Sequence, residues 1–96
     1  MRSPASTSAR SAETVALRAL GFLAACEGAL ERFMAASGAD TDMIREQADD
    51  PVLLAAVMDF LLSDDALMSE FCDGEALDPL FLHRVRRALP GALPDA

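Results

Sequence analysis

The chain has 96 residues, a formal net charge of −8 and a hydrophobic share of 52%. A chain of this length forms one hydrophobic core, burying roughly 60–70% of the surface that the unfolded chain exposes, and it needs neither disulfides nor a metal to fold. Its eight basic residues are too few for a surface that neutralises several phosphates, and the same shortage disfavours an anionic membrane surface. The sequence therefore argues against direct binding of nucleic acid or membranes.

The apolar residues are mainly Ala and Leu, and Tyr and Trp are absent. Ala and Leu are the best helix formers, whereas β-branched and aromatic residues favour strands. No stretch alternates between polar and apolar residues as a strand would. The composition predicts an all-α fold, which we expect to be a compact orthogonal bundle of five to six short helices.

The first half of the chain predicts a tail and three helices. Residues 1–11 are rich in Ser and Ala and lack large apolar side chains, which predicts a disordered tail. Apolar side chains at three- and four-residue spacing predict helices over about 12–25 and about 27–37. Gly38 supplies the left-handed residue that closes a helix. A short third helix is expected to begin at Asp40.

The clearest helix start in the chain is Asp50 followed by Pro51. An aspartate at the N-cap accepts a hydrogen bond from a free backbone N–H, and a proline at the first helical position loses only a donor that has no partner. The helix that follows, over 51–62, is apolar on almost all sides. We therefore expect it to be the central, buried helix.

Two further helices are expected in the second half. The Ser-Asp-Asp run at 63–65 ends the central helix and caps a fifth one, which carries apolar residues between 66 and 72. The Asp-Pro start signal recurs at 78–79 and begins a last helix, which stops before the Pro-Gly at 90–91. Residues 92–96 are expected to form a second tail.

An internal repeat organises the expected domain, which spans 12–91. When the chain is displaced by 38 residues, apolar positions fall on apolar positions and caps on caps. The matched pairs include Leu20 with Met58, Phe22 with Phe60, Leu23 with Leu61, Phe33 with Phe71 and Asp40 with Asp78. The alternative explanation of these matches is that all amphipathic helices place apolar residues at the same three- to four-residue spacing. We interpret the matches as two related three-helix units, about 14–49 and 52–89, paired around the central helix.

The two cysteines, Cys26 and Cys72, lack the C-x-x-C spacing, so buried free thiols in a reducing cytoplasm are expected. Residues 23–26 have the form of a lipoprotein cleavage box. However, Arg18 interrupts the apolar run before them and Glu13 lies where a positive region is required, so one face of a helix fits these residues better. No apolar stretch is long enough to span a bilayer. The sequence favours a cytoplasmic location.

No motif in the chain predicts catalysis. His83 is the only histidine and has no carboxylate within its own turn, so a histidine on a helix surface is expected. Paired acids could hold Mg²⁺ or Ca²⁺, but each pair falls at an expected helix start, where acids cap the helix. We therefore expect no catalytic residue, no cofactor and no metal site. A Cys72–His83 pair brought together by folding is the remaining enzymatic alternative.

The acidic residues are concentrated in the middle of the chain. Twelve carboxylates and a single basic residue, Arg45, lie between Asp40 and Asp78. This segment is either a solvated outer face that keeps the protein soluble or a recognition surface for a basic partner. We select four acids as the candidate partner surface: Asp64, Asp65, Glu70 and Asp73.

The missing chemistry and the acidic segment together predict a non-enzymatic protein-interaction or adaptor module with an unknown protein partner. The alternative is an acidic inhibitor or antitoxin-like mimic, which would occupy a basic groove of a nucleic-acid-binding partner. Aromatic and Arg residues do not gather in one place, so the sequence nominates no interface hot spot and does not set the oligomeric state.

Several segments are distinctive when taken together: residues 19–24, 32–33, 43–45, 60–64, 71–72 and 88–91. With these segments the chain resembles a family of short, uncharacterised alphaproteobacterial proteins, classed as a domain of unknown function. The resemblance covers about 14–91 and is strongest over 50–72. It implies an all-helical protein of a bacterial cytoplasm, and it brings no established activity, cofactor or catalytic residue.

Overall fold

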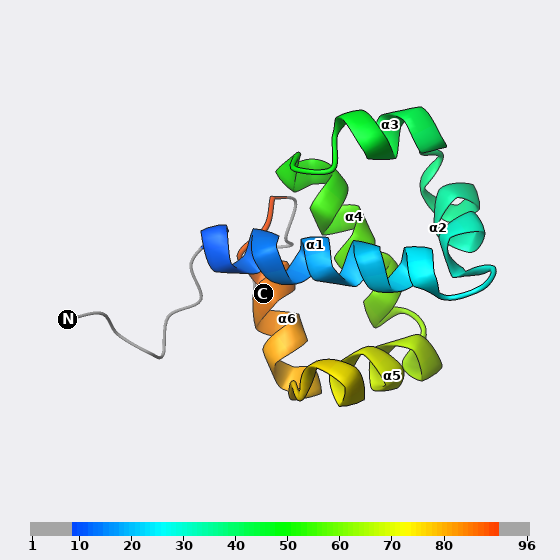
Figure 1. Cartoon of the computed structure of the whole chain (residues 1–96). Helices are drawn as coiled ribbons and strands as arrows, with labels where there is room; N and C mark the ends of the chain where they lie inside the picture. The colour runs from blue at the N-terminus through cyan, green and yellow to red at the C-terminus, as the bar shows by residue number, and fades with distance from the viewer. Residues whose placement is uncertain (1–8, 91–96) are drawn as a thin grey trace.

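The computed structural model describes residues 9–90, and this part of the chain forms six α-helices and no strand. The helices are α1 (Ala9–Ala25), α2 (Ala29–Ser37), α3 (Thr41–Glu46), α4 (Pro51–Leu62), α5 (Asp65–Glu75) and α6 (Pro79–Arg87). The predicted all-α fold is confirmed. Figure 1 shows α1 crossing α4, with α3 near the start of α4 and α5 beyond its end.

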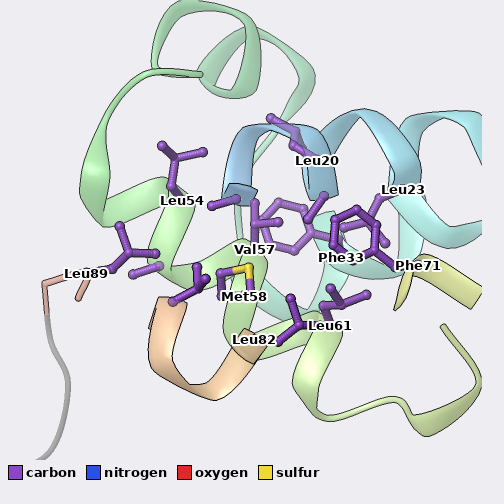
Figure 2. Packing of buried hydrophobic residues seen from close by; sticks show 14 of the residues in the cluster. Leu20, Leu23, Phe33, Leu54, Val57, Met58, Leu61, Phe71, Leu82 and Leu89 are labelled. Carbon is purple, nitrogen blue, oxygen red and sulfur yellow. The ribbon is translucent and has the colours of Figure 1, made fainter. Parts of the chain in front are cut away.

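The centre of the core is α4, as predicted. It packs against α1, α2, α5 and α6. Half of its residues are buried, namely Leu53, Leu54, Ala55, Val57, Met58 and Leu61. Figure 2 shows several of these side chains surrounded by residues of the neighbouring helices, among them Leu23, Phe33 and Leu82. Burial on several sides explains why this helix lacks the polar face of an ordinary surface helix.

The first helix begins earlier than the sequence predicts. Residues 9–11 are helical, so the predicted tail over 1–11 is wrong for these three residues, and its remainder, 1–8, lies outside the described residues. The small side chain of Ala12 is completely buried, which anchors the first turn without a large apolar residue. Packing rather than composition decides the start of this helix.

Other helix ends differ from the prediction by a few residues. The second helix begins at Ala29 instead of residue 27, because Gly28 adopts a left-handed conformation with φ 80° that does not belong to an α-helix. The last helix ends at Arg87, although Leu89 beyond it is buried. The predicted C-terminal tail, 92–96, lies outside the part of the chain that the structure describes.

Four aspartates cap helices, as predicted for each of these starts. Each carboxylate accepts a hydrogen bond from a backbone N–H of the first turn. The pairs are Asp40 with Met43 (2.8 Å), Asp50 with Val52 (2.8 Å), Asp64 with Leu67 (3.1 Å) and Asp78 with Leu80 (2.8 Å). Part of the acidity of the middle segment therefore serves helix initiation.

The predicted two-unit organisation stays a prediction, but several features of the fold support it. At the same displacement of 38 residues, α3 and α6 begin together, and α2 and α5 end together. Gly38 follows α2 and Ala76 follows α5. Both residues are left-handed, and each donates its backbone N–H to a carbonyl of the helix before it. The units differ in their third helices, because α3 has no buried residue whereas α6 buries Leu82 and Val85.

Candidate protein-interaction surface

Three of the four candidate acids lie on the outward side of α5. The helix buries Leu67, Phe71 and Cys72. Asp65, Glu70 and Asp73 are exposed. Because an α-helix turns by about 100° per residue, Asp73 falls between the other two acids within an arc of about 140°. We call these three residues the acidic face.

Asp64, the fourth candidate, differs from the other three because its carboxylate makes hydrogen bonds within the fold. Its carboxylate caps α5 and also accepts a hydrogen bond from Nη1 of Arg32 at 3.3 Å. The backbone hydrogen bond from Leu67 lowers the pKa of Asp64, partial desolvation opposes this effect, and the neighbouring Arg32 adds to the lowering. Asp64 therefore holds the start of α5 to α2, and its charge is already used within the fold.

Ion pairs connect the helices at three places. Arg18 of α1 reaches Glu75 of α5 at 2.7 Å, Arg32 of α2 reaches Asp64, and Arg86 of α6 reaches Asp59 of α4 at 2.6 Å. None of these pairs, which are those described within residues 9–90, includes a residue of the acidic face. The three acids of the acidic face are thus distinct from the acids that form these ion pairs.

The Arg86 contact is a feature that the sequence does not reveal. Besides Asp59, the guanidinium donates to the carbonyl oxygens of Leu89 and Pro90 at 3.4 and 3.0 Å. The side chain of Arg86 is only 15% exposed. In the sequence it is one of three arginines near the end of α6, and no local pattern distinguishes it from Arg84 or Arg87.

The outward side of α6 has the opposite charge. Leu80, His83, Arg84 and Arg87 follow one another at helical spacing and border a shallow hollow of about 210 Å³. Leu80 is 66% exposed, and His83 is exposed on the helix surface, as predicted. The described surface therefore carries an acidic and a basic helix face on consecutive helices.

A second, larger hollow lies between α2 and α4 and was not predicted. Its volume is about 330 Å³. The side chains that line it include Phe33, Ser37, Ala56, Asp59, Phe60 and Ser63. We call it the α2–α4 groove. Nothing in the local sequence indicates it, because it depends on which side chains of two helices face each other.

The cysteines are free, and only one is buried. Cys72 is buried as predicted. Cys26 is only half-buried, so the prediction of a buried thiol is wrong for Cys26. Burial raises the pKa of Cys72, and the nearby Asp73 and Asp78 raise it further. A protonated, buried thiol is a weak nucleophile. Among the described residues, no three His, Cys, Asp or Glu side chains gather where they could hold a metal ion.

Within residues 9–90, these features define an all-α protein that carries an acidic helix face, a basic helix face and the α2–α4 groove. The family model described as a protein of unknown function (DUF3572) matches residues 9–92. The chain belongs to this family, which confirms the predicted resemblance to a domain of unknown function. No curated protein and no solved structure matches the chain. Within the described residues, no helix combines the length and apolarity needed to cross a membrane.

Proposed function

We propose that this protein is a non-enzymatic interaction module of a bacterial cytoplasm that binds a basic segment of a protein partner through the acidic face. One observation supports the proposal most directly. The fold uses Asp64 and Glu75 at the two ends of α5 for ion pairs, whereas Asp65, Glu70 and Asp73 remain exposed between them.

The electrostatics of such a surface suit recognition of a cation-rich segment. Like charges on one helix face repel each other, and a basic partner relieves this repulsion when it binds. The attraction acts over roughly 8 Å at physiological ionic strength, so it accelerates encounter and weakens as salt is added. Salt-sensitive binding is therefore the expected signature.

The test is affinity purification from the native host after crosslinking, read by mass spectrometry. The test variant is Asp65→Lys with Glu70→Lys and Asp73→Lys. A matched control, Glu27→Lys with Glu31→Lys and Glu46→Lys, changes the net charge equally at exposed positions outside α5.

We expect the wild type and the control to capture the same basic partner at low salt, and the test variant to lose it. Equal capture by all three proteins would contradict the proposal. If duplex DNA displaces the captured partner, the acidic-mimic function is supported instead of an adaptor role.

A further inference from the structure

The contact between α1 and α5 contains a ring pair and an ion pair, one helical turn apart. The rings of Phe22 and Phe71 are 5.4 Å apart between centroids, with an interplanar angle of 58°. Arg18 lies four residues before Phe22, and Glu75 lies four residues after Phe71. Because residues four apart share a helix face, the Arg18–Glu75 ion pair stands directly beside the ring pair.

The contact between α2 and α4 repeats the ring pair without the ion pair. The rings of Phe33 and Phe60 are 5.7 Å apart, with an interplanar angle of 68°. The positions one turn away, which correspond to Glu75 and Arg18 at the displacement of 38 residues, are Ser37 and Ala56. Both side chains are small, and the α2–α4 groove of about 330 Å³ lies at this place.

The polar atoms of the groove are suited to a hydrogen-bond donor. Asp59 contributes a carboxylate that is 60% exposed, so it can accept further hydrogen bonds beside those from Arg86. The hydroxyl of Ser63 donates its hydrogen to the carbonyl of Phe60 at 2.7 Å and keeps its lone pairs for another donor. The half-buried ring of Phe60 adds an aromatic surface on which a flat cation can stack.

We propose that the α2–α4 groove binds an arginine side chain of the protein partner, in the position that the chain's own Arg18 takes at the α1–α5 contact. This inference rests on the proposed function, because it assigns the chemistry of the partner segment. A planar guanidinium combines several donors with a face that stacks on a ring, whereas the ammonium of lysine is a compact, strongly hydrated charge. Ser63 lines the groove and directly precedes Asp64, the N-cap of α5, so the groove lies beside the start of the helix that carries the acidic face.

The probe is the peptide acetyl-Ala-Arg-Ala-amide, titrated into the ¹⁵N-labelled protein. We expect saturable shifts of the backbone amide signals of Ala56, Asp59 and Ser63. The citrulline peptide, which lacks the charge, and the lysine peptide should each bind about tenfold more weakly. The absence of saturable shifts at these residues, or equal binding of the lysine peptide, would overturn the assignment.

The groove can be filled by introducing the ion pair that the chain already forms between α1 and α5. The double variant Ala56→Arg with Ser37→Glu places an Arg–Glu pair at the positions equivalent to Arg18 and Glu75 without changing the net charge. The single variant Ala56→Leu fills the groove with an apolar side chain. Helical circular dichroism identifies the variants that fold. Each folded variant should lose at least tenfold in affinity for the arginine peptide, and wild-type affinity in a folded variant would refute the proposal.

The acidic-face variant with lysine at 65, 70 and 73 keeps the groove intact and should retain the groove shifts. Loss of partner capture in that variant together with retained groove shifts supports both proposals. Retained capture with retained groove shifts contradicts the acidic face alone. Loss of the groove shifts in that variant would overturn the groove as an independent site.

Discussion

Arg86 and Asp59 form a two-point ion pair whose partners are unequally buried. Nε of Arg86 lies 2.6 Å from Oδ1 of Asp59, and Nη2 lies 3.2 Å from Oδ2. The side chain of Arg86 is 15% exposed, compared with 60% for Asp59. The same guanidinium binds the carbonyls of Leu89 and Pro90, so this one residue connects the end of α6 to α4.

Replacement of Arg86 should therefore destabilise the protein. We expect Arg86→Leu to lower the free energy of unfolding by about 1–3 kcal/mol, because several charge-assisted hydrogen bonds are lost at a partly buried position. Arg84→Leu, at an exposed position of the same helix, should change it by less than about 0.5 kcal/mol. Urea unfolding followed by circular dichroism measures both, and equal midpoints would contradict the proposed role of Arg86.

The cap at Asp64 should make stability depend on pH in acid. The pKa of Asp64 is lowered in the folded protein, so the folded state prefers the ionised carboxylate. Its stabilising effect is complete above the ordinary carboxyl pKa of 3.8 and disappears as the pH falls through the lower folded value. Asp64→Ala should therefore be less stable than the wild type at pH 7, and the difference should shrink below pH of about 4. Urea midpoints across this range test the expectation, with Asp65→Ala as the control; a constant difference would exclude the cap as its source.

The two thiols should differ in reactivity. Cys72 is buried and its pKa is raised by desolvation, whereas Cys26 is half-buried. At pH 8 we expect a disulfide reagent such as DTNB to modify Cys26 at least tenfold faster than Cys72 in the folded protein. The single variants Cys26→Ala and Cys72→Ala assign the two rates. Similar rates in native buffer, without acceleration by denaturant, would show that Cys72 is accessible.

The corresponding positions after α2 and α5 should both be more stable with glycine than with alanine, because both are left-handed. Ala76 has φ 57° and ψ 45°, a left-handed conformation that glycine adopts without strain. We expect Ala76→Gly to stabilise the protein by about 0.5–1 kcal/mol. This is the net effect, because the relief of strain in the folded state exceeds the greater conformational entropy that glycine gives to the unfolded chain. Gly38→Ala should destabilise it by about 1 kcal/mol, because φ is 78° there although space for a Cβ is open. Thermal unfolding measures both variants, and the same sign for the two would contradict this explanation.

Local chemistry made much of the fold predictable. The Asp50–Pro51 and Asp78–Pro79 starts and the left-handed Gly38 act through neighbouring backbone groups, so the sequence reveals them directly. The start of α1 was not predictable, since it depends on burial of Ala12 against other helices.

The surface was predictable only in part. The outward position of Asp65, Glu70 and Asp73 follows from helical spacing once α5 buries its apolar side. The use of Asp64 by Arg32 and of Asp59 by Arg86 joins residues that are far apart in sequence. The groove at Ser37 and Ala56 likewise depends on the pairing of helices, which local patterns do not specify.

Site-specific photo-crosslinking tests the acidic face as a binding surface most directly. Ser69 lies within the exposed arc of α5 between Asp65 and Asp73, and Ala35 is an exposed position of α2 that serves as the control. With benzoylphenylalanine at each position in turn, irradiation in the native host should yield a protein adduct from position 69 that disappears when the acids at 65, 70 and 73 are replaced by lysine. An adduct from position 35 but none from position 69, or an adduct at 69 that survives these replacements, would contradict binding through the acidic face.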